Sequence, residues 1–261
     1  MADLTFNYDD PEIQYASHRV PDPCIASYIN EALGDTRSLI NVGAGAGSYE
    51  PSDRYVVAVE PLSVMRAQRS AQRKVPAIIG KADTLPFDDS TFDAALATLT
   101  IHHWPDIAKG LQELHRVSND RILILTFDPN AMDIFWGFNY FGEMLEAERL
   151  KFPTMDFITR VLGDHCEVKT IPIPLDCTDG FIEAFYGRPE AFLNPSVRKA
   201  QSAWGFLSSG VEEQLVTRLQ QALDSGEWDR KYGYLRNQPE FTGSLRLVIA
   251  RKPRAKSLFA H

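Results

Sequence analysis

The stretch Leu39-Ile40-Asn41-Val42-Gly43-Ala44-Gly45-Ala46-Gly47 decides the fold class of this chain. It joins a short apolar run to three glycines at alternate positions. Glycines after a strand allow backbone torsions that other residues avoid, and the lack of a Cβ lets a ligand approach the backbone closely. In open parallel sheets, ligands bind beyond the carboxyl ends of the strands. The stretch therefore predicts a first strand over 38–42, followed by a ligand-binding loop.

The strand pattern continues outward from this stretch. Apolar runs rich in β-branched residues alternate with helical patterns, which favours a parallel sheet with crossover helices. We therefore expect an α/β fold with a doubly wound, mostly parallel, seven-stranded sheet. Its strands are predicted over 38–42, 55–60, 76–79, 92–97, 121–126, 167–172 and 244–250. Helices are predicted from Ser63, over about 104–117 with Pro105 near the first turn, over 155–162, and from Ser209 to Gly226.

Two segments break the alternation of strands and helices. Residues 128–153 include a dense aromatic run, and residues 176–240 separate the last two predicted strands. We expect a single domain over 1–261, with its core in about 1–127, 154–175 and 240–253, and with 128–153 and 176–240 inserted as a helical cap. In the second insertion, Ser209 and Glu212 have the spacing of a capping box, and Gly226 can end the helix.

The composition excludes several classes of protein. The 261 residues are 44% hydrophobic and 24% charged, which is ordinary for a globular chain. A net charge of −8 disfavours nucleic acid as a partner. One basic cluster has near-helical spacing, which is typical of a solvated helix face, and comprises Arg66, Arg69, Arg73 and Lys74.

The location is predicted from what the sequence lacks. We see no secretory signal at the N-terminus and no apolar run of the roughly 20 residues that span a bilayer. The three cysteines fit neither a disulfide framework nor a zinc site. We therefore expect a cytoplasmic protein, a monomer or homodimer, without a metal and without a membrane partner.

Glu60 strengthens the prediction of a ligand site. It ends the predicted second strand, 17 residues after Gly43, where a carboxylate can accept the ribose hydroxyls of an adenosine. The plainer alternative is an exposed carboxylate at a strand end. The pattern also suits a nicotinamide dehydrogenase, but the dinucleotide pattern needs glycine or alanine at position 48, where Ser48 stands.

Four segments, in this order, resemble the motifs of class I S-adenosylmethionine-dependent methyltransferases. They are the glycine stretch over 39–47 and the segments 59–65, 80–93 and 97–104. The resemblance is to type 11 enzymes, which act on small molecules and are often associated with secondary metabolism. It implies their Rossmann-like fold, S-adenosyl-L-methionine as cofactor, S-adenosyl-L-homocysteine as product, and metal-independent methyl transfer to a small-molecule substrate.

The resemblance also implies which residues contact the cofactor. Glu60 would hold the ribose, Met65 would pack on the adenine, and the pair Ala82-Asp83 would meet the adenine edge. Arg19 would pair with the carboxylate of the cofactor, which a guanidinium can bind with two hydrogen bonds. The full predicted set is Tyr15, Arg19, Asn41, Gly43, Ala44, Gly45, Gly47, Glu60, Pro61, Met65, Ala82, Asp83, Thr84, Thr98, Leu99 and His103.

Two features depart from the family pattern. The first motif usually begins with an acid, where this chain has Asn41. Only residues 48–54 separate Gly47 from the second strand, which is too short for an ordinary crossover helix. These departures keep an alternative open, namely a non-catalytic cofactor-binding or scaffold protein of the same fold.

Methyl transfer from a sulfonium is an in-line displacement, in which the cofactor supplies the reactivity and the protein supplies position. His102 or His103 could act as a base, or both could simply support the loop. Asp128 is a weaker candidate base. A set of aromatic residues could line the acceptor or could pack in the core, and comprises Phe135, Trp136, Tyr140, Phe185 and Tyr186.

Overall fold

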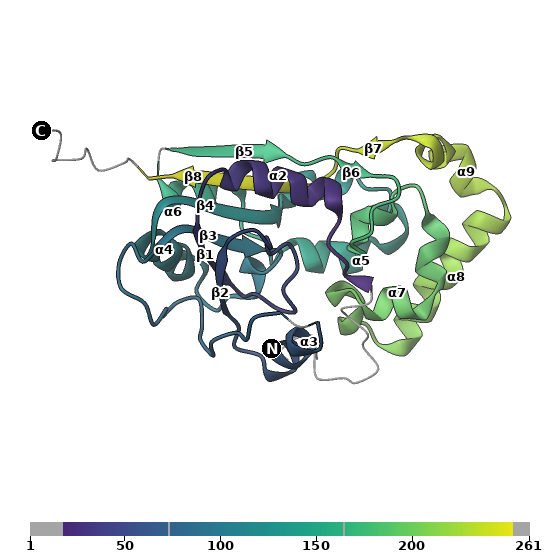
Figure 1. Cartoon of the computed structure of the whole chain (residues 1–261). Coiled ribbons are helices and arrows are strands. Elements are labelled where there is room, and N and C mark those ends of the chain that lie inside the picture. Colours follow the sequence, from purple (N-terminus) through teal and green to yellow (C-terminus); the bar gives the residue numbers. More distant parts are fainter. Residues whose placement is uncertain (1–17, 73, 164, 253–261) are drawn as a thin grey trace, which may run out of the picture. The chain divides into compact units, whose positions relative to one another are not determined.

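The computed structural model describes residues 18–72, 74–163 and 165–252 (Figure 1). The chain divides into two compact units. The sheet unit consists of Ser27–Thr126, Pro153–Lys169 and the described part of Arg246–His261. The aromatic unit consists of the described part of Met1–Ala26, with Phe127–Phe152 and Thr170–Leu245. One domain with a two-part cap stays a prediction.

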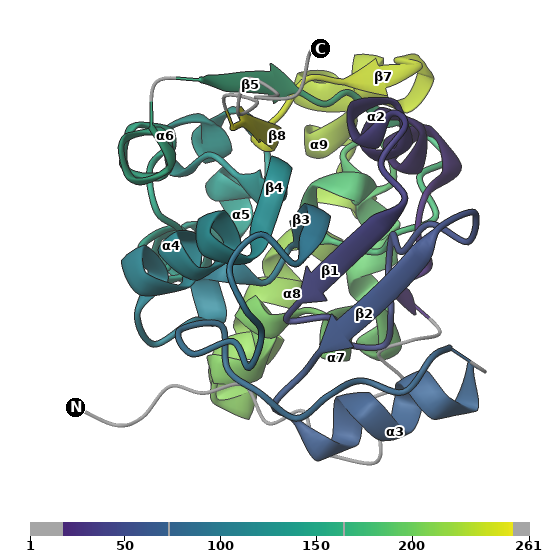
Figure 2. The ribbon, with the colours of Figure 1, turned by 60° about the vertical axis from the view of Figure 1, so that its left-hand side comes forward.

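The main sheet has six strands in the order β2-β1-β3-β4-β8-β5. They are β1 Ser38–Val42, β2 Tyr55–Val59, β3 Phe92–Thr98, β4 Ser118–Phe127, β5 Cys166–Thr170 and β8 Leu245–Arg251. Strand β1 pairs in parallel with both β2 and β3, so that Asn41 lies opposite Ala58 and Leu96. Figure 2 shows these three strands side by side. The predicted α/β fold is confirmed, with the loop after β1 at the carboxyl ends of the parallel strands β2, β1, β3 and β4.

The predicted strand over 76–79 is reduced to a single bridge. Ile78 pairs in parallel with Val59, and its N–H donates to the carbonyl of Ala58 at 2.8 Å. Its own carbonyl accepts from the N–H of Glu60 at 3.0 Å. Pro76 has no N–H to continue the ladder, and Gly80 follows directly. The described residues thus form six strands in the main sheet instead of the predicted seven.

The helices agree with the predicted pattern in most places. They are α2 Pro23–Leu33, α3 Ser63–Ala71, α4 Ile107–Val117, α5 Phe138–Arg149, α6 Met155–Leu162, α7 Pro195–Lys199, α8 Ser209–Asp224 and α9 Glu227–Tyr232. Helix α4 begins after Asp106, whose side chain accepts from the N–H of Lys109 at 2.9 Å. Pro105 directly precedes this N-cap, near the first turn of the helix as predicted.

The predicted capping box of α8 is wrong. The N-cap is Ser208, with no side-chain cap hydrogen bond. The carboxylate of Glu212 accepts from Nε of Arg198 at 2.6 Å, so it does not reach back to the start of the helix. The predicted end of the helix is confirmed, because Gly226 follows the C-cap in the left-handed conformation with φ +70°.

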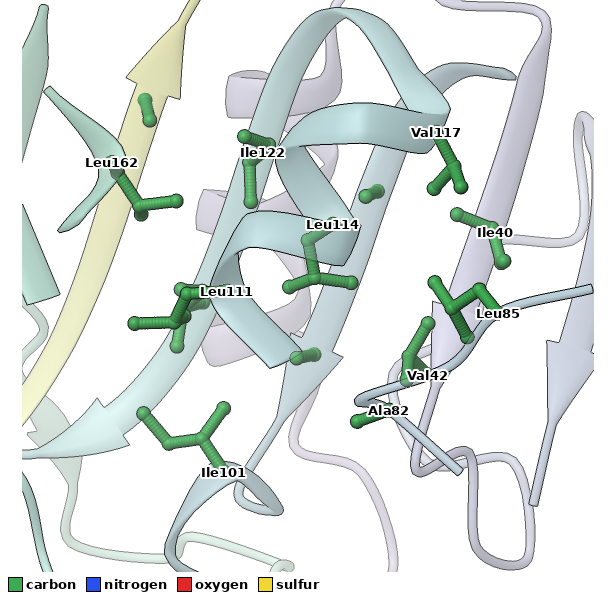
Figure 3. Close-up of a cluster of buried hydrophobic side chains, with 14 of the residues drawn as sticks. Ile40, Val42, Ala82, Leu85, Ile101, Leu111, Leu114, Val117, Ile122 and Leu162 are labelled. Carbon is green, nitrogen blue, oxygen red and sulfur yellow. The ribbon is translucent and has the colours of Figure 1, made fainter. Parts of the chain in front are cut away.

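One side of the sheet carries the core that positions the loop. Ile40 and Val42 of β1 are fully buried together with Leu111, Leu114 and Val117 of α4 (Figure 3). Strand residues two apart share a face, and helix residues three and four apart share a stripe, so the two patterns meet. Asn41 lies between Ile40 and Val42 and therefore points to the other face of the sheet.

The aromatic unit is built differently. It contains a two-stranded antiparallel sheet of β6 Ile173–Pro174 and β7 Glu240–Phe241. Five short 3-10 helices connect its α-helices, namely η2 Pro129–Ile134, η3 Ile182–Phe185, η4 Pro189–Leu193, η5 Ser202–Phe206 and η6 Gly233–Asn237. None of the helices in the described residues is long and apolar enough to cross a membrane.

Candidate functional site

The loop after β1 takes a shape that requires glycine at three points. Gly43, Gly45 and Gly47 have φ of +68°, +50° and +95°. The N–H groups of Gly43 and Ala44 donate to the carbonyl of Val59 at 2.9 and 3.0 Å, which ties the loop to the end of β2. No helix forms among residues 43–54, as the short connection predicted.

The surroundings of the three glycines differ. A Cβ on Gly43 would lie 2.2 Å from Oγ1 of Thr100, and one on Gly47 would lie 2.8 Å from a guanidinium nitrogen of Arg69. A Cβ on Gly45 would meet no atom of the described residues within 4 Å. The loop is therefore packed at both ends, and its middle is open to a ligand.

Glu60 reaches from the end of β2 to this loop. Its Oε2 accepts from the N–H of Gly45 at 2.8 Å, and its Oε1 accepts from the N–H of Leu62 at 2.9 Å. Only 4% of the residue is exposed, so the alternative of an exposed strand-end carboxylate is wrong. Burial raises the pKa of the Glu60 carboxyl, against the opposing effect of the two N–H donors and of Arg66 and Arg69.

The buried side chains of Asn41, Glu50 and Arg69 form a hydrogen-bonded polar chain that supports the loop. Nδ2 of Asn41 donates to Oε1 of Glu50 at 2.9 Å. The guanidinium of Arg69 binds both oxygens of Glu50, at 2.6 and 2.9 Å. The prediction of a solvated helix face is wrong for Arg69, whose side chain is 1% exposed. Glu50 was missed as a functional residue, and an acid inside so short a connection was its only signal in the sequence.

The residues of the second and third motifs lie around the same strand ends. Met65 is buried on α3, and Pro61 before it is exposed. Ala82 is buried in the core cluster, whereas Asp83 is half-buried and Thr84 is exposed. Of these residues, Asp83 and Thr84 present polar groups toward solvent.

The fourth motif follows β3 to the loop. Leu99 has φ +51°, a strained value for a branched side chain, and its N–H donates to the carbonyl of Leu125 at 2.8 Å. Oγ1 of Thr98 donates to the carbonyl of Ser48 at 3.5 Å. His102 is half-buried and His103 is exposed, and their ring centroids lie 3.9 Å apart on the 3-10 helix η1 Ile101–His103. Strained backbone of this kind clusters at functional sites.

The sheet unit thus brings together Asn41, the glycine loop, Glu60 and the end of β3. Arg19 belongs to the aromatic unit, where its Nε donates to Oδ1 of Asp179 at 2.5 Å. Tyr15 lies outside the described residues. Asp128 caps η2 by accepting from the N–H of Asn130 at 3.0 Å. Cofactor contacts of Arg19 and Tyr15 stay predictions.

The predicted acceptor wall lies in the aromatic unit. Phe135, Trp136, Tyr140 and Tyr186 are buried, and Nε1 of Trp136 donates to the carbonyl of Tyr186 at 2.8 Å. Phe185 is half-buried beneath the guanidinium of Arg188. This burial favours the packing interpretation for the four buried residues, and a contact with the acceptor stays a prediction.

No group of three or more His, Cys, Asp or Glu residues in the described part of the chain could hold a metal ion. The candidate site presents the carboxylate of Glu60, the amide of Asn41, a histidine pair and the backbone of the loop.

This chain is similar in sequence and in fold to known proteins. A family model described as a methyltransferase domain matches residues 40–124. A putative methyltransferase from an antibiotic biosynthesis pathway of Anabaena variabilis ATCC 29413 has a similar solved structure, with a TM-score of 0.82 and 29% identity. That alignment covers 90% of this chain and 99% of the other.

Two further relatives extend the comparison. The geranyl diphosphate C-methyltransferase of Streptomyces coelicolor A3(2), solved with Mg2+, geranyl diphosphate and S-adenosyl-L-homocysteine, shares the fold, with a TM-score of 0.50 and 14% identity. The alignment covers 88% of this chain and 78% of that one. The demethylmenaquinone methyltransferase of Corynebacterium kroppenstedtii is 31% identical over 104 residues, which are 37% of this chain and 44% of the relative. The chain aligns with between a quarter and 44% of the length of such curated relatives.

The matched segment contains the glycine loop, Glu60 and the strands around them. The family model identifies residues 40–124 as a methyltransferase domain, and the fold around them is that of the Rossmann-like methyltransferases.

Proposed function

We propose that this protein transfers a methyl group from S-adenosyl-L-methionine to a small-molecule acceptor, without a metal. The observation that carries the proposal is the bond between Glu60 and the N–H of Gly45, at the open middle of the glycine loop. This bond places the buried carboxylate at the end of β2 beside the accessible backbone of the loop that follows β1. A nucleoside that carries a linear substituent can offer its ribose hydroxyls to the carboxylate and can place the substituent along the backbone of the loop.

The residues present fit such a cofactor. Gly45 leaves space where any other residue would place a Cβ. Oδ1 of Asn41 is buried, and no group in the described part of the chain hydrogen-bonds to it, so it can accept from a donor on a ligand. Glu60 would accept the ribose hydroxyls with the lone pairs that its two backbone donors leave over.

When bound, this cofactor supplies a methyl group activated by a positive sulfur. The chain supplies orientation and a route for a proton. His103, which is exposed, and His102 beside it can take a proton from an oxygen or nitrogen nucleophile near neutral pH. Transfer to an acceptor that needs no deprotonation would use positioning alone.

We also propose that aromatic side chains form a wall for an apolar or aromatic acceptor. The wall would include Phe185, whose ring is half-buried. The relatives named for demethylmenaquinone and for an antibiotic pathway support a small-molecule acceptor. We further propose a cytoplasmic monomer or homodimer, without a nucleic-acid or membrane partner.

The second candidate is a non-catalytic protein that binds the cofactor. Asn41 in place of the usual acid and the missing helix between β1 and β2 favour it. Methyl-labelled cofactor separates the two candidates, because any labelled organic product shows catalysis. If a histidine is the base, His102→Gln or His103→Gln should lower the rate of transfer by roughly 10²- to 10⁴-fold.

A calorimetric titration tests the proposal itself. S-adenosyl-L-methionine and S-adenosyl-L-homocysteine should bind with micromolar affinity, and NADH should not bind. Glu60→Ala should weaken binding at least about tenfold, because it removes an ionic acceptor of hydrogen bonds. Glu31→Ala, which removes an exposed acid of α2, is the matched control and should bind as the wild type does. Equal affinities for Glu60→Ala and the wild type would overturn the site.

A further inference from the structure

Glu50 and Arg69 form an ion pair inside the sheet unit that none of the four motifs explains. The two side chains are 4% and 1% exposed, and they meet through two parallel hydrogen bonds. Nε of Arg69 also donates to the carbonyl of Val75. Removing two charges from water is costly, and a buried ion pair is weak evidence of a gain in stability. The contacts of the pair point instead to a role in positioning its neighbours.

The pair fixes the orientation of Asn41. A carboxylate can only accept hydrogen bonds, so the amide must turn its NH2 group toward Oε1 of Glu50, which it meets at 2.9 Å. The opposite orientation would bring two acceptor oxygens together. Because Arg69 holds both oxygens of Glu50, the carboxylate cannot rotate away to relieve such a clash.

This orientation leaves an acceptor unused. Oδ1 of Asn41 is buried and has no hydrogen-bond partner among the described residues, and the whole residue is 0% exposed. A buried polar atom without a partner is costly, so such atoms are rare unless a ligand or an ordered water completes them. The group that completes this one must be a donor.

The place of Asn41 in the sheet indicates which part of the cofactor supplies the donor. Glu60 stands at the end of β2, Asn41 lies on β1, and Thr98 ends β3, in that spatial order. Neighbouring strands are roughly 4.8 Å apart. If the base packs on Met65 of α3, as the family resemblance implies, a nucleoside whose ribose lies at Glu60 extends its 5′ substituent over β1 and toward β3. In the proposed cofactor, that substituent ends in an ammonium group.

We infer that Glu50, held by Arg69, is a positioning residue that makes Asn41 present its oxygen to the ammonium group of the cofactor. The inference rests on the proposed function. It adds that recognition of the amino-acid end depends on a carboxylate that does not itself touch the cofactor. The first motif has no acid at position 41. The acid at position 50 acts in its place, through its hydrogen bond with Asn41.

A structural role of the same pair must be separated from this one. A Cβ on Gly47 would lie 2.8 Å from a nitrogen of Arg69 and 3.2 Å from Oε2 of Glu50, so the pair also supports the glycine loop. Damage to the loop would weaken every ligand that the loop binds. Misorientation of Asn41 would weaken only ligands that carry the ammonium group.

The test compares S-adenosyl-L-homocysteine with 5′-methylthioadenosine, which keeps the nucleoside and the sulfur but lacks the amino-acid end. In Glu50→Gln, the new amide can donate as well as accept, and so Asn41 is free to turn. We expect the affinity for S-adenosyl-L-homocysteine to fall roughly 10- to 100-fold, as for one hydrogen bond to a charged group. The affinity for methylthioadenosine should stay within about twofold.

Asn41→Leu is the companion variant, because it removes the amide and leaves the ion pair intact. It should show the same selective loss. Glu50→Gln added to Asn41→Leu should cause no further loss, since Glu50 acts through Asn41. If Glu50→Gln fails to fold, as judged by thermal unfolding, the selective loss in Asn41→Leu carries the test.

The outcomes separate the inference from the proposed function. Equal weakening of both ligands, or no weakening of either, overturns the positioning role while cofactor binding stands. A wild-type protein that binds neither ligand overturns the proposed function, and the inference falls with it.

Discussion

The sheet unit and the aromatic unit reach their structures by different means. In the sheet unit, parallel strands and the helix α4 share one core, and each element follows a regular spacing of apolar residues. In the aromatic unit, five 3-10 helices interrupt the chain, and rings pack edge to face. Regular strands and helices require apolar residues at a fixed spacing in the sequence, whereas ring packing requires only that aromatic residues be present. The site can be derived in the first unit for that reason.

The largest expected effect comes from the rings. Phe141 is 0% exposed, and its ring centroid lies 5.0 Å from that of Trp204 and 5.4 Å from that of Phe192. Phe141→Ala should lower the free energy of unfolding by about 3–5 kcal/mol. Ile134→Ala, at an exposed position nearby, should cost less than about 0.5 kcal/mol. Urea unfolding measures both, and similar costs for the two variants would show that the rings do not form a core.

The next effect sharpens the contrast within the glycine loop. Gly43→Ala should cost about 2–4 kcal/mol of unfolding free energy, because its Cβ would meet Thr100 in addition to the left-handed backbone. Gly45→Ala should cost only about 1–2 kcal/mol, since the backbone term acts alone.

Binding should separate the same two glycine variants in a second way. In Gly45→Ala the new methyl occupies the open side of the loop, so the folded protein should bind S-adenosyl-L-homocysteine at least about tenfold more weakly. Chemical unfolding and calorimetry together decide this. An unchanged affinity in Gly45→Ala would place the ligand elsewhere.

Much of the sheet unit was predictable, and its exceptions have physical causes. Helix α6 has the predicted bounds Met155–Leu162, because its apolar positions follow a helical period between clear ends. The strand around Ile78 shrank because Pro76 lacks a donor, which spacing alone does not weigh. The burial of Arg69 was not predicted, because a basic residue on a helix is usually solvated. The sequence also does not reveal its partner Glu50, which meets Arg69 only when the short connection is folded.

The candidate site divides in the same way. Glu60 and the glycines were predicted from their spacing after two strands, which the parallel register brings to one edge. The sequence could not decide whether the aromatic residues pack in the core or contact the acceptor, because both roles use the same kinds of side chain. Burial of Trp136 and Tyr186 favours packing, and this follows from tertiary contacts that no local pattern encodes.

A smaller effect is expected with pH. Burial raises the pKa of Glu60 above its ordinary value of 4.5. The folded protein therefore binds this proton more tightly than the unfolded chain, so the contribution of Glu60 to stability is largest below pH 4.5 and is lost as the pH rises through the raised pKa. Ribose binding needs the ionised carboxylate and has the opposite dependence.

The measurement is a series of calorimetric titrations of S-adenosyl-L-homocysteine from about pH 8 to about pH 5. Wild-type affinity should fall toward the acid end, beginning above the ordinary pKa of a glutamate. Glu60→Ala should bind weakly and without that dependence. The same acid-side loss in both proteins would assign it to another group.

The smallest effect tests the aromatic unit again. Nε2 and Oε1 of Gln201 are buried and have no hydrogen-bond partner within residues 18–72, 74–163 and 165–252. Gln201→Leu keeps most of the volume and removes two unpaired polar atoms, so it should raise the free energy of unfolding by about 1 kcal/mol. Urea unfolding measures the change, and a loss of stability would show that the amide is satisfied in solution.

We propose that the open glycine loop and Glu60 together bind the sulfur cofactor. Hydrogen–deuterium exchange, measured with and without saturating S-adenosyl-L-homocysteine, tests it most directly. Peptides covering 41–50, 58–66 and 96–104 should exchange more slowly with the ligand, because they contain the loop, Glu60 and the end of β3. Unchanged exchange in these peptides, at a ligand concentration that calorimetry shows to be saturating, would contradict the account.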